Sequence, residues 1–308
     1  MESIRIKPLD ILSESQLSEI RQKNDLRNIF ALIFDWGLMV LGLYVFYHYP
    51  SVLTFLASVV IIGSRQFALA VLAHDGAHNL LFSNSKINDF VSQWFCAYPI
   101  FQDNRVYRPY HLKHHRFTET EDDPDIVLSA PFPINKKSFF RKVIRDLTGI
   151  TGYKRYSSSL ISIFQTEAEN FPDKVSRIWN KIHGFFIVNF IVFILISIFF
   201  HWSLFFLLWW LPAFTYYSLI IRIRNIAEHC VTPGESDFDK TRTTKASLII
   251  RFLLAPHRVN YHLEHHLFMM CPWYNLPKAH LMMLENGYED KMCLENSYRS
   301  VLSKAVSA

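Results

Sequence analysis

Two long apolar regions dominate the pattern of hydrophobic and polar positions along the chain. The first runs from about residue 29 to 73 and is interrupted by the polar, proline-containing segment 48–51. The second runs from about residue 184 to 221 and is interrupted at 201–203. A bilayer core needs roughly 20 apolar residues per helix, so each region predicts two spans joined by a tight turn. The predicted spans cover about residues 29–48, 51–73, 184–200 and 203–221.

The remaining segments, 1–28, 74–183 and 222–308, carry nearly all of the lysines and arginines, whereas the two tight turns carry none. Because basic residues are retained on the cytoplasmic side, these segments are expected to form a cytoplasmic cap over the spans. An even number of spans then places both termini in the cytoplasm. The pattern predicts an all-α integral membrane protein, with residues 1–308 forming one domain.

Composition agrees with this picture. Half of the 308 residues are hydrophobic, 16% are aromatic, and the formal charge of +5 is too small to suggest nucleic-acid binding. The four cysteines form no C-x-x-C pair, which favours reduced thiols over a disulfide framework. Basic and apolar residues alternate over 136–145, as expected of a helix on a membrane surface or of a docking site for an acidic electron-transfer protein.

Two charged residues stand out near the predicted spans. Asp35 lies inside the first span and is expected to face the interior of the bundle and pair with a buried polar group. Arg65 lies about one bilayer thickness after the first turn and is expected at the cytoplasmic boundary.

The fourteen histidines carry the strongest chemical signal. One H-x-x-x-H motif and two H-x-x-H-H motifs occur, and one more histidine follows the fourth span. These nine candidate metal ligands are His74, His78, His111, His114, His115, His229, His262, His265 and His266. The isolated residues His48, His183, His201, His257 and His280 are instead expected to have surface or packing roles.

The spacing of the motifs explains how they would bind metal. Helical residues three or four apart share one face, so His74 and His78 can reach a single ion. Adjacent histidines diverge by about 100° and can serve two neighbouring ions. Nine imidazoles exceed the four ligands of a typical zinc site, so two metals of higher coordination number are expected.

Carboxylates near the motifs are candidates for orienting the ligands. A metal-bound histidine usually donates its second ring N–H to such an acceptor. The candidates are Asp75, Asp122, Asp123, Asp125, Glu228 and Glu264.

These motifs, interleaved with four spans over about residues 30–280, resemble those of the membrane fatty acid desaturase family. The resemblance implies a non-haem centre of two iron ions that uses O2 to remove hydrogen from an unactivated methylene. The eight histidines of the three motifs match the family's ligands. Asn225 and His229 match the N-x-x-x-H of acyl-CoA desaturases, which implies a ninth ligating histidine and an asparagine that holds a water near one metal.

The resemblance leaves several functions open. We expect desaturation of an acyl lipid or acyl thioester, with a hydroxylase or ketolase of a carotenoid, sterol or alkane as one alternative. A non-catalytic membrane protein that binds metal is the other. No His-Pro-Gly-Gly motif of a fused cytochrome b5 occurs, so an external electron donor, a ferredoxin or a cytochrome b5-type protein, is expected. A bacterial inner membrane is the favoured location, with the endoplasmic reticulum as the alternative.

Overall fold

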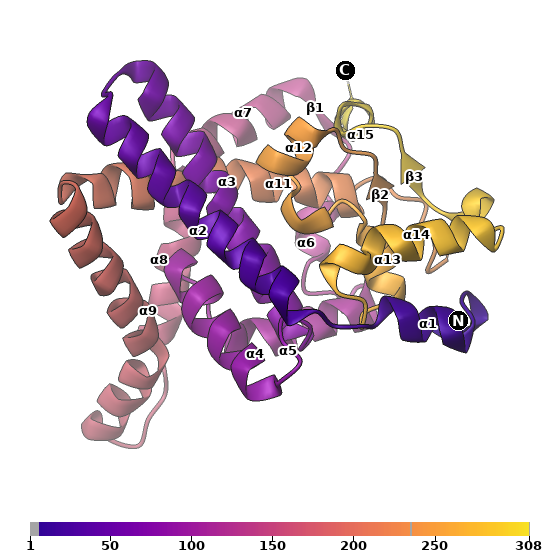
Figure 1. Ribbon diagram of the computed structural model, residues 1–308, viewed down its shortest axis with the longest axis horizontal. Helices are drawn as coiled ribbons and strands as arrows, with labels where there is room; N and C mark the ends of the chain where they lie inside the picture. Colours follow the sequence, from indigo (N-terminus) through magenta and orange to yellow (C-terminus); the bar gives the residue numbers. More distant parts are fainter. Residues whose placement is uncertain (1–5, 235, 308) are drawn as a thin grey trace.

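The computed structural model describes residues 6–234 and 236–307 of the chain, and these are predominantly helical (Figure 1). Within those ranges the strands are only two residues long and pair in parallel. β1 (Ile134–Asn135) pairs with β4 (Val306–Ser307), and β2 (Thr243–Thr244) pairs with β3 (Leu294–Glu295). The predicted all-α fold is therefore confirmed. Residues 1–5, 235 and 308, which the predicted cap includes, lie outside the described residues.

Four helical segments of the described chain are long and apolar enough to cross a membrane. The first contains α2 (Asp25–His48), the second is α3 (Val52–Ala77), and the third is α9 (Phe171–Phe199). The fourth covers Phe205–His229. The helices continue past the predicted apolar runs on the polar side, so α9 begins thirteen residues before residue 184. Polar residues can extend a helix beyond the segment that hydropathy detects.

The α2–α3 hairpin has a tight turn and a close helix contact. Ser51 caps α3 by accepting a hydrogen bond from the backbone N–H of Thr54. Farther along, the Ser58 hydroxyl donates to the carbonyl of Gly42 at 2.8 Å. A Cβ atom at Gly42 would lie 3.1 Å from the Ile62 side chain, so glycine allows the two helices to approach closely here.

The fourth apolar segment is not one regular helix. It consists of the π-helical turn η4 (Phe205–Trp210), the short α10 (Leu211–Phe214) and α11 (Tyr216–His229). Thr215, with φ −105° and ψ −88°, separates α10 from α11. Pro212 lacks a backbone N–H and cannot continue the regular hydrogen-bond pattern. In the same segment, Gln66 of α3 donates its side-chain N–H to the carbonyl of Trp209 at 2.8 Å.

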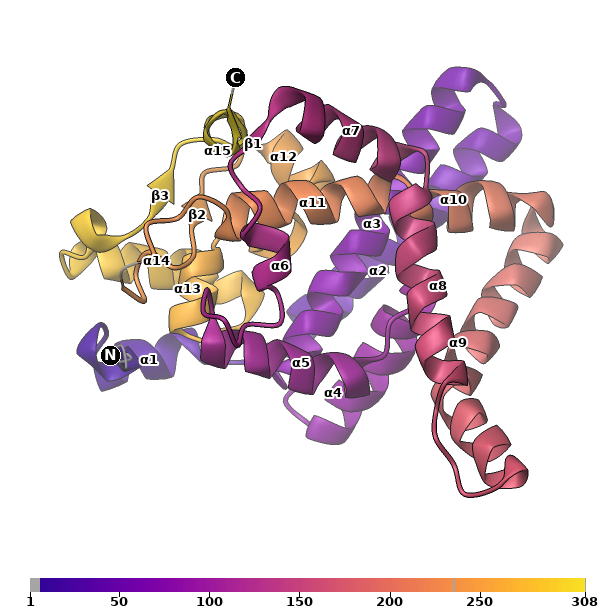
Figure 2. The same ribbon diagram turned by 180° about the vertical axis from the view of Figure 1, so that it is seen from behind.

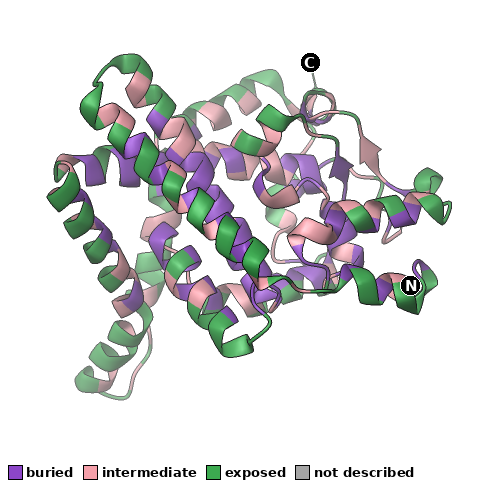
Figure 3. Cartoon of the chain, in the orientation of Figure 1, coloured by how far each residue is buried: buried purple, intermediate pink, exposed green. Residues whose placement is uncertain are grey.

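Burial differs sharply among these helices (Figure 3). α3 is mostly buried in the centre, whereas α2 and α9 display large apolar side chains on the surface. Phe30 on α2 and Ile198 on α9 are 69% and 68% exposed. An exposed apolar surface of this extent is typical of lipid-facing helices, and together with the four apolar segments it supports membrane localisation.

Short helices of the central segment pack against the spans (Figures 1 and 2). The helices of this segment are α4 (Ser85–Val91), the π-helical η2 (Ser92–Ala97), η3 (Tyr98–Ile100), α5 (Asn104–Phe117), α6 (Ile126–Ser129), α7 (Lys136–Leu147) and α8 (Ile150–Phe164). Most of them contact α3 or α11.

The two ends of the chain complete the cap. The N-terminal elements are η1 (Pro8–Asp10) and α1 (Glu14–Ile20). The C-terminal elements are α12 (Leu248–Leu253), η5 (Pro256–Arg258), α13 (His262–Leu267), η6 (Trp273–Asn275), α14 (Leu276–Glu285), η7 (Glu289–Lys291) and α15 (Tyr298–Ala305). One apolar core lies among the spans and includes Met39, Leu69 and Trp209. A second joins α1 to α13 and α14 through Leu17, Leu263 and Met283.

Asp35 is completely buried and has two partners. Its carboxylate accepts from Arg65 Nη1 at 3.0 Å and contacts His257 Nε2 at 2.7 Å. The pairing expected for Asp35 is therefore present. Arg65 is itself only 2% exposed, and the half-buried His257 has a packing role as a partner of this aspartate.

Candidate metal centre

The nine predicted histidines lie together in two adjacent groups. The first group contains His74, His78, His111, His115 and His265. The second contains His114, His229, His262 and His266. Within each group, one nitrogen of every ring lies within 4.8 Å of the others, close enough to share an ion.

The rings of the first group point their Nε2 atoms at one another. His111 Nε2 lies 3.0 Å from His78 Nε2, and His115 Nε2 lies 2.9 Å from the Nε2 atoms of both His111 and His265. The ring of His74 lies 4.4 Å, between centroids, from those of His111 and His265. Residues from α3, α5 and α13 thus converge on one point.

The second group has the same character. His262 Nε2 lies 2.9 Å from His229 Nε2 and 3.1 Å from His266 Nε2. His114 lies 4.8 Å from His229 and 5.0 Å from His266, between ring centroids. Here α5, α11 and α13 supply the rings.

The adjacent histidines of each H-x-x-H-H motif separate into different groups. On α5, His111 and His115 are four residues apart and share the first group, while His114 enters the second. On α13 the arrangement is reversed, because His262 and His266 share the second group and His265 enters the first. The divergence of neighbouring helical side chains produces this split.

A glycine allows the end of α3 to reach its position. Gly76, between His74 and His78, faces η2, where an added Cβ atom would lie 2.2 Å from Ser92 Cβ. Asn104, at the start of α5, donates its side-chain N–H to the carbonyl of Ala73 at 2.7 Å. These contacts hold α3, η2 and α5 together next to the first group.

The environment of these rings suits metal binding. Burial, followed by the influence of neighbouring histidines, lowers the pKa of His111, His115, His262, His265 and His266. Burial, followed by the charge of Arg108, lowers the pKa of His78 to about 4. The rings are therefore neutral, which is the form that binds metal. Within the described part of the chain, neither ring nitrogen of His74 has a hydrogen-bond partner. Converging neutral nitrogens, together with a His74 ring that has no hydrogen-bond partner among the described residues, fit a cation.

Asp123 supports a ring of the second group from behind. Its Oδ1 lies 2.8 Å from His114 Nδ1, so the ring donates there and leaves Nε2 free to act as a ligand. Asp123 also accepts the backbone N–H groups of Glu119 and Asp125. These interactions lower its pKa although burial acts in the opposite direction. The adjacent Asp122 is exposed on the surface.

Two other predicted carboxylates lie close to ligand nitrogens. Asp125 Oδ2 is 3.7 Å from His114 Nδ1. Glu228 Oε2 is 3.4 Å from His262 Nε2, the nitrogen that faces the second group, and Glu228 is also paired with Arg224. Glu228 therefore adds negative charge on the metal-facing side rather than behind a ring.

The remaining two carboxylates serve mainly as anchors. Asp75 Oδ1 is 3.5 Å from His74 Nδ1, but its Oδ2 accepts the backbone N–H of Trp273 at 3.0 Å. Glu264 lies 2.6 Å from His280 Nδ1 and accepts the Thr243 hydroxyl. Glu264 therefore ties α13 to α14 and β2 instead of orienting one of the nine rings, and His280 is its partner rather than an isolated histidine.

Three neighbours of the rings have no signal in the histidine motifs. Glu119 Oε1 lies 3.6 Å from His229 Nδ1, and the Thr118 hydroxyl lies 3.2 Å from His266 Nδ1. Tyr107 stacks on His111 with 5.1 Å between ring centroids. Thr118 and Glu119 follow the second motif directly, so their position in sequence was the available clue. Asn225 is half-buried, one helical turn before His229 on α11.

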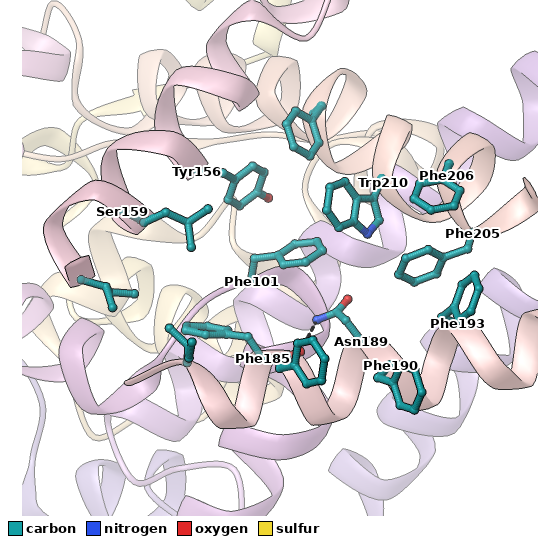
Figure 4. A pocket seen from close by; sticks show the side chains of 15 residues that line it. Phe101, Tyr156, Ser159, Phe185, Asn189, Phe190, Phe193, Phe205, Phe206 and Trp210 are labelled. Atoms are coloured by element: carbon teal, nitrogen blue, oxygen red, sulfur yellow. Dashed lines mark hydrogen bonds between the residues drawn. The ribbon is translucent and has the colours of Figure 1, made fainter. Parts of the chain in front are cut away.

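Two hollows are relevant to a substrate. An apolar groove of about 520 Å³ lies between α8, α9 and the start of the fourth apolar segment (Figure 4). Phe101, Phe185, Phe190 and Trp210 line it, and none of the nine histidines does. A second pocket of about 470 Å³ includes His115 and His266 in its wall, one histidine from each group.

Sequence comparison agrees with the arrangement of the site. Residues 50–292 match the fatty acid desaturase family model, which covers most of the chain and all nine histidines. The chain belongs to the fatty acid desaturase family. Among curated proteins, this family member is similar to dihydrorhizobitoxine desaturase of Bradyrhizobium elkanii, with 29% identity over 249 residues, covering 75% of this chain and 68% of that protein. Family membership and this similarity support an oxidoreductase of the desaturase and hydroxylase type.

Proposed function

We propose that the protein catalyses the O2-dependent desaturation of an acyl chain, carried as an acyl lipid or an acyl thioester. The observation that carries this proposal is the pair of buried histidine groups that share α5 and α13. We assign His74, His78, His111, His115 and His265 to one iron ion and His114, His229, His262 and His266 to the other.

Iron would supply the redox chemistry that zinc lacks. In the balanced reaction, two adjacent methylenes each lose one hydrogen, and O2 takes these together with two electrons and two protons to give two waters. An external ferredoxin or cytochrome b5-type donor would provide the electrons.

The protein's own groups prepare this site. Burial lowers the pKa of ligand rings such as His111 and favours their neutral form, and Asp123 fixes the orientation of His114. Glu228 places a carboxylate beside the second group. Asn225, on the same helical face as His229, would hold a water near the second metal. Most of the nine rings are buried, which limits access of bulk water.

The apolar groove of Figure 4 supports an acyl substrate. Its volume of about 520 Å³ falls within the ~300–1,000 Å³ range of small-molecule pockets. The relative from Bradyrhizobium elkanii is named for dihydrorhizobitoxine, so that similarity supports the reaction class and not the acyl substrate. We place the site on the cytoplasmic face of a bacterial inner membrane, with the endoplasmic reticulum as the alternative.

Labelled dioxygen separates desaturation from hydroxylation or ketone formation on a carotenoid, sterol or alkane. Iron-loaded protein would be reconstituted with a reducing system and acyl lipids under labelled O2, and the products analysed by mass spectrometry. We expect loss of two hydrogens and label only in water. Label in the organic product would assign an oxygenase instead.

The same experiment addresses a non-catalytic metal-binding protein. The matched control is His265→Ala, which removes one ligand of the first group. Metal uptake by the unmodified protein with no O2- and reductant-dependent lipid product would favour that alternative. Product formed equally by the variant would contradict the assigned centre.

A further inference from the structure

A third hollow, near the membrane boundary, has features that suit a different ligand. It has a volume of about 1,020 Å³ and lies between α2, α12, η5 and η6. We call it the arginine groove, after the four arginines in its wall, Arg27, Arg65, Arg251 and Arg258. Among the described residues, none of the nine histidines and no aspartate or glutamate lines it.

One wall of the arginine groove is apolar and open to the surroundings. On α2, Phe30 and Ile33 are 69% and 63% exposed. On α12, the neighbouring Leu248 and Ile249 are 75% and 70% exposed. Because α2 is one of the apolar segments long enough to cross a membrane, this wall faces the acyl chains of the bilayer.

The arginines on these helices and on η5 carry positive charge that the protein does not neutralise. The only groove arginine paired with a carboxylate in the described chain is Arg65, which shares the buried Asp35 with His257. Arg27 lies over the ring of Tyr274, at 5.0 Å from its centroid. The buried Nε atom of Arg251 has no hydrogen-bond partner in the described part of the chain. Three guanidinium groups of the groove therefore have no carboxylate partner among the described residues.

The backbone at the bottom of the groove is also unusual. His257 and Arg258 both have positive φ, 48° and 57°. Such conformations cost on the order of 1–3 kcal/mol for residues other than glycine and tend to occur at ligand sites. Asp35 and Trp273 fix His257, the first by the 2.7 Å contact and the second by a ring contact of 4.8 Å.

We propose that the arginine groove binds a lipid with an anionic phosphate headgroup, which Arg27, Arg251 and Arg258 hold while an acyl chain lies along Phe30 and Ile33 of α2. Basic pockets at the cytoplasmic ends of membrane helices suit such headgroups. A zwitterionic lipid is disfavoured because the groove offers no carboxylate to its cationic group. This site is separate from the histidine groups and does not depend on the proposed reaction.

Lipid binding to the whole purified protein tests the proposal. Protein in neutral detergent would be titrated with short-chain phosphatidylglycerol and with phosphatidylcholine of the same chain length, and bound lipid measured by native mass spectrometry. We expect phosphatidylglycerol to bind more than tenfold tighter, since each interfacial basic residue contributes about 1 kcal/mol, or roughly fivefold.

Variants identify the groove as the site. Arg251→Gln with Arg258→Gln should reduce the preference by about 25-fold and leave roughly the fivefold contribution of Arg27. The corresponding lysine pair should retain most of the original preference. Arg299→Gln, at an exposed arginine on α15, is the matched control and should bind like the unmodified protein. Unchanged thermal unfolding would show that the variants are folded.

Three results would overturn the proposal. They are equal affinity of the unmodified protein for the two lipids, an undiminished preference in the glutamine pair, and binding of glycerol 3-phosphate as tight as that of phosphatidylglycerol. The last result would assign the groove to a soluble phosphate.

Discussion

His114 and His115 are neighbours in the chain, but their rings belong to different groups. The same is true of His265 and His266. Each of these side chains therefore has one position to fill, and a neighbouring histidine cannot replace it. This makes the assignment of ligands testable one residue at a time.

Replacing His114 or His265 by alanine is expected to lower the iron content and reduce turnover more than about 100-fold, since even the loss of an outer-shell partner costs 10–100-fold. Iron would be measured by elemental analysis of purified protein. His183→Ala is the control, because His183 contacts the carbonyl of Trp179 on α9 and lies outside both groups. Full activity in either ligand variant would contradict the assignment.

Asp123 and Asp122 form a matched pair for testing ligand orientation. Asp123→Asn removes the charge that holds the His114 ring at 2.8 Å and should reduce activity or metal affinity by about 10–100-fold. Asp122→Asn changes the same charge at an exposed neighbouring position and should have little effect. Equal losses in both variants would mean that general electrostatics, not orientation of His114, controls the site.

At the scale of elements, close helix packing depends on small residues. α8 lies against α10 at Gly152, where an added Cβ atom would come within 2.5 Å of the carbonyl oxygen of Phe214. The obstacle is backbone, so a side-chain rotation cannot relieve it.

Gly152→Ala should therefore lower the free energy of unfolding by about 1–3 kcal/mol, the usual cost of overpacking. Gly37→Ala on α2 is the control, because nothing lies within 4 Å of its added Cβ atom. There alanine should be neutral or stabilise the helix by up to about 1 kcal/mol. Thermal unfolding in detergent would compare them, and a stable Gly152→Ala protein would show that α8 is free to shift.

Local sequence features predicted much of the elements and the site. Apolar runs predict spans because hydropathy is a property of consecutive residues, and the histidine spacing predicts shared faces because helical geometry is regular. Contacts between residues far apart in the chain could not be predicted from these local features. His257 reaches Asp35 from 222 residues away, and Glu264 turns toward His280 rather than a ligand ring. The break at Thr215 was also missed, since the apolar pattern continues through it.

At the scale of the whole molecule, the spans and the histidine groups make a prediction about orientation. The α2–α3 pair and the α9–α11 segment should each cross the membrane twice, so the histidines and both termini should lie on one side of the membrane. Because basic residues are retained on the cytoplasmic side, we predict that this side is the cytoplasmic one.

Reporter fusions test this orientation. A fluorescent protein that folds only in the cytoplasm should be active at either terminus, and a cysteine introduced at Ser51, in the α2–α3 turn, should react with an impermeant reagent from outside. A cysteine in place of Ser236, on the cap side, provides the comparison and should be protected in intact cells. The reverse labelling pattern would invert the proposed topology.

The contribution of α5 and α13 to both histidine groups also has a thermodynamic consequence. Because α5 and α13 each contribute rings to both groups, an ion held in the first group restrains the helices that carry most ligands of the second. The first ion therefore bears the entropy cost of ordering those helices, and the second ion binds to helices that are already ordered. Loading should therefore be cooperative, with protein molecules mainly empty or doubly filled rather than carrying a single ion.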